Sequence, residues 1–495
     1  MQSIVERIER ARARAHEIAR RTPLERARRL SERLGARVLL KREDLQPVHS
    51  FKLRGAYNKI VSLSAEEAAR GLVAASAGNH AQGVALAAQK LAYQETILMP
   101  TTTPEIKVQA VRALGAEVLL HGDTYDDACD EALRLVDERD AVFVHAYDDV
   151  DVIAGQGTVA VEILEQHPEP IDAIFVPVGG GGLLAGVLAY IKSMRPDTAI
   201  IGVEPSDAAC LHATLEAGEP VPLDHVGIFA DGAAVRQVGT EPFRIVNGRL
   251  DGMVRVSVDE ICAAIQDLFE DTRGIAEPAG ALAVAGMKQW VAAGGLAGAE
   301  GAGRTLVAIQ SGANMNFHRL RHVSERAELG EEREAIFAVT IPERNGSFRR
   351  LCSALGDRSV TEFNYRYAGD SDAHVFVGIE LREGRTERDT IARELRDAGY
   401  PVLDLTGNEL ALIHTRYMVG GRAASVEKER LLRFGFPERP GALRRFLELM
   451  SPDWAITLFH YRNHGAALGR VLAGIAVPEA DYEAFEQYLE DLAYR

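Results

Sequence analysis

Short aliphatic runs alternate with alanine-rich stretches of helical period from residue 36 to about residue 317. Ala81–Lys90 and Glu105–Leu114 are the clearest helical stretches. This alternation predicts βα units, a parallel sheet and helices on both of its faces. The predicted strands are Val38–Leu40, Leu72–Ala75, Thr96–Met99, Glu117–Leu120, Ala141–His145, Ile171–Val178, Ala199–Val203 and Thr305–Gln310. Since such sheets bind ligands at the carboxyl ends of their strands, we expect functional residues directly after the strands.

The last third of the chain contains an internal repeat. Pro342–Gly346 reappears with one change as Pro437–Gly441, and Phe363–Arg366 is similar to Phe459–Arg462. Each copy predicts a strand, a turn, a helix, two strands and a helix, which is most of a ferredoxin-like unit. The sequence therefore predicts an α/β domain over residues 1–325 and two α+β repeats over residues 335–420 and 429–495. The second repeat stops where its last strand is expected, which predicts an open sheet edge.

Composition and charge exclude several classes of protein. The formal net charge of −16 disfavours a nucleic-acid partner. The four cysteines lack the spacing of a zinc site or a disulfide framework, so we expect a reducing, cytoplasmic setting. Ala173–Ile191 is uncharged and long enough to span a bilayer, but Pro177 and the glycine run Gly179–Gly182 interrupt it. We therefore expect a strand, a turn and a helix there, and no membrane span.

Two motifs open predicted helices. Lys52 lies between Phe51 and Leu53, and apolar neighbours of this kind can bury an amine, lower its pKa and suit it to Schiff-base chemistry. A solvated surface lysine is the commoner case. Ser76–His80 follows a strand, and its small residues can present backbone N–H groups to a substrate carboxylate. A plain helix cap explains that segment equally well.

Two further motifs follow predicted strands. The run Gly179–Gly182 can wrap around a phosphate at a helix N-terminus. The same glycines, with Ala185 and with Glu204 at the end of the next strand, also fit a loose nicotinamide-dinucleotide fingerprint. Gln310–Asn314 follows the last strand of the domain, where a serine or asparagine is more often part of a turn or a cap than a ligand.

The order of these segments decides between the two cofactors. Pro47–Ala56, Ser76–Gly83, Gly179–Leu183 and Ser311–Asn314 together resemble the fold-type II pyridoxal-phosphate enzymes of the tryptophan-synthase β family. With its doubled C-terminal module, the chain is similar to the biosynthetic threonine dehydratases. The dinucleotide alternative leaves the lysine, asparagine and serine of these motifs without a role. The resemblance implies a two-lobed pyridoxal-phosphate domain with parallel-rich sheets, two ACT-like repeats and a homotetramer.

The resemblance also implies roles for individual residues. Lys52 would bind pyridoxal 5'-phosphate covalently and act as the catalytic base. The remaining cofactor contacts would be Phe51 on the ring, Asn79 on the 3′-oxygen, Gly179, Gly180, Gly181, Gly182 and Leu183 on the phosphate, and Ser311 at the pyridine nitrogen. The substrate carboxylate would be bound by Ser76, Ala77, Gly78, Asn79 and His80, with help from Gln156.

Two acidic segments carry further expectations. A related branch of racemases and dehydratases holds a metal after the turn that begins at Glu204, but this chain has Cys210 where that branch places its last acid, so we expect no metal. Glu277 either lies near the cofactor or caps the helix that follows it.

The implied reaction converts L-threonine, and also L-serine, to a 2-oxo acid and ammonia. With threonine the product is 2-oxobutanoate, the entry to isoleucine biosynthesis. The repeats would bind isoleucine as inhibitor and valine as activator, and Phe348, Tyr365 and Tyr461 either line these effector pockets or pack the core. A serine-directed pyridoxal-phosphate dehydratase or racemase is the alternative, and a nicotinamide oxidoreductase is more remote. An amino-acid sensor without catalysis leaves the first 320 residues unexplained.

Overall fold

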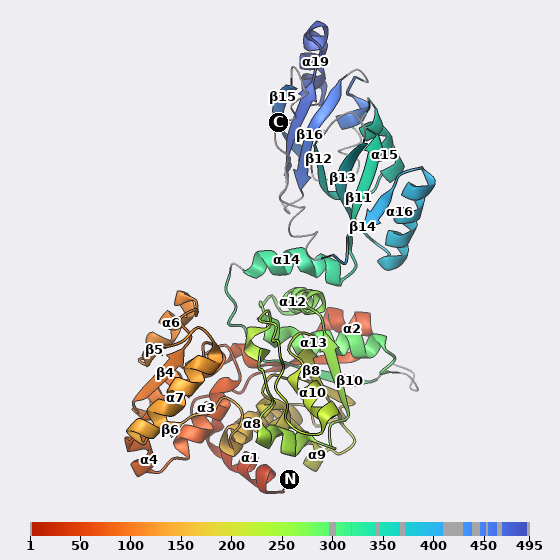
Figure 1. Cartoon of the computed structure of the whole chain (residues 1–495). Coiled ribbons are helices and arrows are strands. Elements are labelled where there is room, and N and C mark those ends of the chain that lie inside the picture. The colour runs from red at the N-terminus through yellow and green to blue at the C-terminus, as the bar shows by residue number, and fades with distance from the viewer. Residues whose placement is uncertain are drawn as a thin grey trace. The chain divides into compact units, whose positions relative to one another are not determined.

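The structure is a computed structural model that describes residues 2–296, 303–317, 319–342, 344, 346–366, 372–408, 429–437, 446–451, 454–462 and 468–492. The chain divides into two compact units, Met1–Ala327 and Glu328–Arg495. The first unit has two lobes, each built on its own sheet (Figure 1). Much of the repeated turn Pro437–Gly441 lies outside the described residues.

The large lobe contains a six-stranded sheet in the order β1-β2-β10-β7-β8-β9, in which only β1 runs antiparallel to its neighbour. The strands are β1 (Leu24–Arg26), β2 (Arg37–Arg42), β7 (Ala173–Pro177), β8 (Ala199–Pro205), β9 (Gly252–Val256) and β10 (Thr305–Gln310). Their buried side chains alternate between two apolar clusters, one shared with α1, α8 and α9 and the other with α2, α12 and α13. The sheet is therefore covered by helices on both faces.

The small lobe contains a four-stranded parallel sheet in the order β5-β4-β3-β6. Its strands are β3 (Leu72–Ala75), β4 (Glu95–Met99), β5 (Glu117–Leu120) and β6 (Val142–Phe143). Helices α3, α5 and α6 pack on one face and α7 packs on the other. The predicted strand over residues 141–145 is longer than β6, because the His145 ring accepts hydrogen bonds from the backbone N–H groups of Tyr147 and Asp148 and the chain turns there.

The helices of the first unit connect these strands in the expected alternation. They are α1 (Gln2–Ala15), α2 (Arg28–Leu34), α3 (Lys52–Val61), α4 (Ala65–Ala69), α5 (Asn79–Leu91), α6 (Glu105–Arg112), α7 (Tyr125–Arg139), α8 (Val150–Gln166), α9 (Gly182–Met194), α10 (Cys210–Ala217), α11 (Thr240–Val246), α12 (Val258–Thr272), α13 (Pro278–Ala292) and α14 (Arg319–Gly330), with the short 3-10 turns η1 (Glu43–Leu45) and η2 (Asp231–Ala233). The uncharged run 173–191 forms β7, a turn and most of α9. No helix within the described ranges is both long and apolar enough to cross a membrane.

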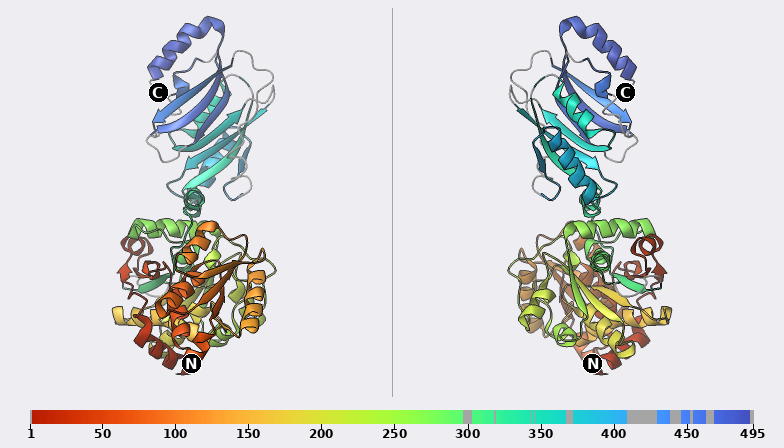
Figure 2. Two further views of the ribbon diagram at one scale, coloured as in Figure 1. Left: turned by 90° about the vertical axis from the view of Figure 1, so that its left-hand side faces the viewer. Right: turned by 90° about the vertical axis from the view of Figure 1, so that its right-hand side faces the viewer.

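The second unit is built on one antiparallel sheet of seven strands in the order β14-β11-β13-β12-β16-β17-β15 (Figure 2). Its elements are β11 (Glu334–Pro342), α15 (Ser347–Leu355), β12 (Val360–Arg366), β13 (Asp372–Glu380), α16 (Arg385–Asp397), β14 (Val402–Asp404), β15 (Glu429–Pro437), β16 (Ala455–Arg462), β17 (Leu468–Ala476), η3 (Glu479–Asp481) and α19 (Tyr482–Leu492). In the described part of the second repeat, no strand follows α19, and β15 forms the end of the sheet.

The two repeats join through their repeated motif. Strand β12 pairs antiparallel with β16, so that Phe363 lies opposite Tyr461 and Tyr365 lies opposite Phe459. The repeat pattern alone predicts two ferredoxin-like units, and the shared sheet is the additional feature that the structure reveals. Together with the two lobes of the first unit, this arrangement confirms the predicted fold class.

Candidate active site

Lys52 is the first residue of α3 and is partly buried. Its Nζ donates a hydrogen bond to the backbone carbonyl of Ala146 at 3.0 Å and lies 5.5 Å from the centre of the Phe51 ring. No carboxylate of the described residues forms an ion pair with it. Burial lowers the pKa of Lys52 to about 8, although the negative charge of Glu277 opposes this shift. About a tenth of this amine is therefore neutral and nucleophilic at pH 7, and about half at pH 8.

The turn before Lys52 is fastened to the segment that follows β10. The backbone N–H of Phe51 donates to the carbonyl of Ser311 at 3.2 Å, and Ser50 forms a β-bridge with Gly312. His49 adopts a φ of 54°, a left-handed conformation that is uncommon outside glycine. The hydroxyl of Ser311 is buried and donates to the carbonyl of Ala279 at 3.3 Å. Two segments far apart in the sequence, Phe51–Lys52 and Ser311, are thus held side by side.

The glycine run lies between β7 and α9 and closes around Tyr147. Tyr147 directly follows Ala146, whose carbonyl accepts the hydrogen bond from Lys52. A Cβ at position 180 would lie 2.2 Å from Cγ of Tyr147, and one at position 182 would lie 3.0 Å from the Tyr147 carbonyl oxygen. Gly181 has a φ of 89°, which favours glycine. Helix α9 begins without a side-chain cap, so its first N–H groups are oriented to bind an anion.

Asn79 opens α5 and forms hydrogen bonds at both ends of its amide. Its Nδ2 donates to Oε1 of Glu277 at 2.6 Å, and its Oδ1 accepts from Nδ2 of Asn314 at 2.7 Å. Asn79 therefore does not cap α5, and no other side chain caps it. The Ser76 hydroxyl accepts from the N–H of Gly78 at 3.2 Å, just before the helix begins. The backbone donors at the start of α5 are therefore left for another acceptor.

His80 directs its side chain away from this loop. Its Nε2 lies 2.7 Å from the carbonyl of Val144, and the ring is only 2% exposed. Burial, followed by the charge of Lys52, lowers the pKa of His80 to about 3, so the imidazole is neutral and its Nε2 carries the donated proton. A contact between His80 and the substrate stays a prediction.

Glu277 lies on the site side of α13 and does not cap that helix with its side chain. Its Oε1 accepts from Asn79, and a Cβ at position 312 would lie 2.1 Å from that oxygen. Burial raises the pKa of Glu277 to about 7, with a further contribution from the charge of Asp231. Of the two alternatives that the sequence leaves open for this residue, the geometry favours the position near the site.

Comparisons with known proteins agree with this geometry. Residues 16–312 match the family described as "Pyridoxal-phosphate dependent enzyme", and residues 325–414 and 420–495 match the "C-terminal regulatory domain of Threonine dehydratase". The L-threonine dehydratase biosynthetic IlvA of Burkholderia multivorans is 55% identical over 97% of this chain and 94% of that protein. The protein of the same name from Escherichia coli is 52% identical over 98% of this chain and 93% of its own length. The chain belongs to the pyridoxal-phosphate-dependent biosynthetic threonine dehydratases.

A solved structure of this family shows the same catalytic fold. The processed form of threonine deaminase isoform 2 from Solanum lycopersicum is 46% identical, with a TM-score of 0.62 over 65% of this chain and 93% of that one. The site contains the groups that pyridoxal phosphate needs: a buried amine of lowered pKa for its aldehyde and an uncapped helix N-terminus beside glycines for its phosphate. The prediction of this cofactor over a nicotinamide dinucleotide is confirmed.

Glu204, the acid on which the dinucleotide alternative depends, has a structural role in this chain. Glu204 is fully buried and accepts from the backbone N–H groups of Leu211 at 2.7 Å and His212 at 3.0 Å. Its carboxylate thus satisfies the start of α10. Within the described residues, no group of three or more histidine, cysteine, aspartate or glutamate side chains is placed to hold a metal ion.

Gln156 contacts α3, the helix that carries Lys52. It is buried on α8, and its Oε1 accepts from the backbone N–H of Gly55 at 3.2 Å. A Cβ at position 55 would lie 2.3 Å from its Nε2. Gln156 therefore supports the first turn of the helix that carries Lys52, and its contact with the substrate stays a prediction.

A network of buried charges lies on the other side of α3. Arg54 is only 2% exposed, and its guanidinium binds Glu43 at 2.7 Å and Glu162 at 2.7 Å. Lys41 donates to Glu162 at 2.5 Å. Two cations are thus matched by two carboxylates, and the network fixes α3 against α8. No motif or spacing in the sequence indicates these pairs. Arg54 and Glu162, for example, are more than 100 residues apart along the chain.

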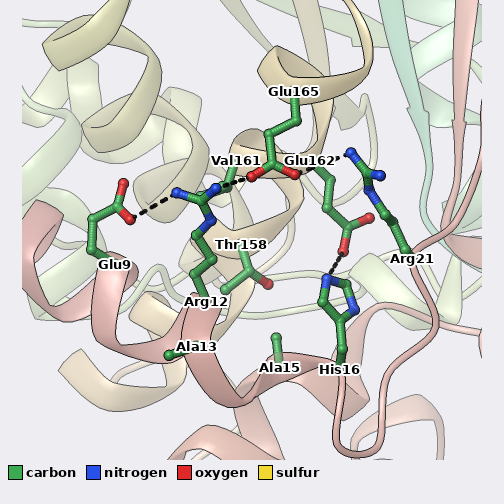
Figure 3. A pocket seen from close by; sticks show the side chains of 10 residues that line it. All are labelled: Glu9, Arg12, Ala13, Ala15, His16, Arg21, Thr158, Val161, Glu162 and Glu165. Atoms are coloured by element: carbon green, nitrogen blue, oxygen red, sulfur yellow. Dashed lines mark hydrogen bonds and ion pairs between the residues drawn. The ribbon is translucent and has the colours of Figure 1, made fainter.

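A surface pocket lies between α1 and α8 and shares Glu162 with this network. Figure 3 shows Glu162 facing His16 across it, at 3.7 Å, and Arg12 between Glu9 and Glu165. None of the predicted cofactor or substrate residues lines this pocket, and its charged groups pair with one another. It is therefore separate from the Lys52 site.

The three aromatic residues predicted for the effector sites are buried in the core of the second unit. Phe348, Tyr365 and Tyr461 are between 7% and 8% exposed. The ring centre of Phe348 lies 4.8 Å from that of Phe363 and 5.6 Å from that of Phe459. Their packing agrees with the core alternative, and a role in binding effectors stays a prediction.

Proposed function

We propose that this chain dehydrates and deaminates L-threonine to 2-oxobutanoate and ammonia, the first step toward isoleucine, at the site around Lys52. The observation that carries the proposal is the amine of Lys52, which is partly buried, oriented by the Ala146 carbonyl and lowered in pKa to about 8. An amine of this kind can bind the cofactor covalently and then take a proton at pH 7–8.

When bound, pyridoxal phosphate supplies an electron sink for the carbanion that forms at the substrate Cα. The residues of the chain do the rest. Lys52 Nζ accepts the α-proton of threonine, and the Ala146 carbonyl fixes the position of that nitrogen. The residues Gly179–Leu183 and the start of α9 hold the phosphate through backbone N–H groups. Phe51, the residue before Lys52, would pack against the cofactor ring.

The opposite side of the site orients the substrate. The backbone of Ser76–His80 and the uncapped start of α5 bind the substrate carboxylate, which the positive end of the helix dipole favours. Asn79, fixed between Glu277 and Asn314, would hold the 3′-oxygen of the cofactor. Ser311 would present a neutral hydroxyl to the pyridine nitrogen, which would moderate the electron sink and favour elimination over transamination.

The second unit is proposed to bind isoleucine as inhibitor and valine as activator, as two repeats over residues 335–420 and 429–495. This is supported by the two matches to the regulatory domain and by the sheet that the repeats share through β12 and β16. We further propose a homotetramer. The four cysteines are unpaired, which supports the reducing cytoplasm as the setting.

A steady-state assay of 2-oxo acid formation tests the reaction. L-threonine should give the higher kcat/KM, L-serine should react more slowly, and isoleucine should inhibit. One methyl group in a pocket changes selectivity by about 1–3 kcal/mol, so some turnover of serine is expected and does not contradict the proposal. Formation of D-serine without 2-oxo acid would overturn the proposal in favour of a racemase. A flat isoleucine response would remove only the feedback.

A further inference from the structure

Two cationic side chains, from different parts of the catalytic unit, meet at the carboxylate of Asp231. Asp231 Oδ2 forms an ion pair with Nζ of Lys107 at 2.6 Å, and Asp231 Oδ1 lies 3.6 Å from the guanidinium of Arg319. Lys107 belongs to α6 of the small lobe, Asp231 to the turn η2 of the large lobe, and Arg319 is the first residue of α14. All three are partly exposed, at 22%, 30% and 33% of their side chains.

The turn η2 borders the Lys52 site. A Cβ at Gly179, in the glycine run, would lie 3.0 Å from Cα of Ala233. A Cβ at Gly232 would lie 3.6 Å from both Nδ2 of Asn79 and Oε1 of Glu277. A shift of η2 would therefore disturb both the predicted phosphate loop and the asparagine that opens α5. The ion pair between Lys107 and Asp231 joins this turn to the opposite lobe.

Arg319 holds the same turn from another direction. Its Nη1 donates to the carbonyl of Phe229, two residues before Asp231, at 2.9 Å. Helix α14 is itself fixed to α12 by an ion pair between Arg326 and Asp259 at 2.6 Å. The second unit begins at Glu328, which lies in the last turn of α14. The turn that borders the site is thus in contact with the helix that leads to the regulatory repeats.

We propose that Asp231 is a positioning residue that latches the small lobe to the large lobe over the substrate site, with Arg319 linking this latch to α14. The latch holds η2, and with it the glycine run and Asn79, in the arrangement that binds threonine. Loss of the latch lowers the population of the binding-competent arrangement and therefore raises KM more than it lowers kcat. The proposal rests on the threonine activity proposed above.

The holoenzymes of Asp231→Asn, Lys107→Met and the double variant test this latch. A partly exposed ion pair contributes about 0.2–1 kcal/mol, so each single variant should raise KM for threonine by about 1.5- to 5-fold with kcat nearly unchanged. The double variant should show no larger increase than Asp231→Asn alone, because Lys107→Met removes an interaction that Asp231→Asn has already removed. Asp231→Glu keeps the negative charge and should therefore raise KM less than Asp231→Asn does. Additive increases, or an unchanged KM, would overturn the proposal.

Arg304→Met is the matched control. Arg304 is 33% exposed like Arg319, but its ion pair with Asp172 at 2.9 Å lies within the large lobe. Its KM should equal that of the unaltered chain, whereas Arg319→Met should raise KM, by less than Asp231→Asn since its gap to Asp231 is wider. Equal effects of Arg304→Met and Arg319→Met would contradict the assigned link.

Amide hydrogen exchange gives a readout that does not need turnover. Helix α6 should exchange faster in Asp231→Asn and Lys107→Met than in Arg304→Met. If the chain showed no threonine activity, a change confined to α6 and η2 would still support the latch, and the failure would belong to the proposed reaction. Unchanged exchange in α6 in both latch variants would overturn the latch itself.

Discussion

Lys41, which is buried, and Lys52, which is partly buried, have opposite surroundings. Lys41, on β2, is fully buried, and its Nζ donates to Glu162 at 2.5 Å and to the carbonyl of Thr22 at 2.7 Å. Lys52 has the carbonyl of Ala146 as its hydrogen-bond acceptor and no ion-pair partner among the described residues. Burial is the first cause that lowers the pKa of both amines.

The comparison teaches that burial alone does not make a lysine reactive. At Lys41 the carboxylates of Glu43 and Glu162 oppose the lowering of the pKa by burial, and the amine pairs directly with Glu162 as part of a structural network. At Lys52 one acid, Glu277, opposes burial from a distance, and the pKa is about 8. Among the described residues no carboxylate pairs directly with Lys52, and this leaves the amine available for chemistry.

The largest expected effect is on turnover. Lys52→Ala should lose at least about 10³-fold in kcat, because it removes both the covalent attachment of the cofactor and a general base worth roughly 10²–10⁴-fold. Lys41→Met should retain most of its turnover per folded molecule. The measurement is the rate of 2-oxobutanoate formation, normalised to bound cofactor for the Lys41 variant. Comparable losses in both variants would break the distinction between the two lysines.

The second effect is on stability. Arg54→Met should lower the free energy of unfolding of the catalytic unit by about 3–5 kcal/mol, because two buried carboxylates lose their shared cation. Arg304→Met, which breaks a partly exposed pair, should change it by about 0–1 kcal/mol. Urea denaturation followed by circular dichroism measures both. A loss below 1 kcal/mol for Arg54→Met would show that the network does not stabilise α3.

The third effect is on cofactor affinity. In Gly180→Ala the new methyl group would meet the ring of Tyr147 at 2.2 Å, so the loop or the ring must move. Overpacking of this kind costs about 1–3 kcal/mol. We expect weaker binding of pyridoxal phosphate to the apoenzyme, measured by its absorption, and partial recovery in the double variant with Tyr147→Ala. Unaltered affinity in Gly180→Ala would argue against the phosphate site at this loop.

The smallest effect is a shift in pH dependence. Only the neutral amine attacks an aldehyde, so cofactor uptake by the apoenzyme should accelerate as the pH rises through about 8, the pKa of Lys52, and then level off. Glu277 raises that pKa, so Glu277→Gln should move the midpoint of uptake to lower pH. Stopped-flow absorption at several pH values measures the midpoint. A shift to higher pH would show that Glu277 does not act on Lys52 through its charge.

The sequence predicts the site best where local chemistry determines the backbone. Gly179–Gly182 and Ser76–His80 follow apolar strands, and both segments open helices in the structure. Ser311 follows β10, and its carbonyl accepts from the N–H of Phe51. The parallel βα pattern predicts functional residues at the carboxyl ends of strands. The strand order is not predicted, and neither is the placement of Ser76–His80 after a strand of one sheet and of Gly179–Gly182 and Ser311 after strands of the other.

The partners of these residues could not be predicted, because they are set by tertiary packing. Tyr147 fills the space beside Gly180, and Asn314 bonds Asn79 from a segment 235 residues away. The sequence singles out the motif that contains Asn314, but it does not indicate which residue Asn314 bonds. The pairing of β12 with β16 likewise depends on the aromatic residues that the two repeats place opposite each other.

The most direct test of the central claim is to locate the amine that carries the cofactor. The holoenzyme is reduced with borohydride, digested and mapped by mass spectrometry. We predict a single phosphopyridoxyl group, on the peptide that contains Lys52. A group on Lys41 or on any other lysine, or a reduced protein without the added mass, would contradict the account.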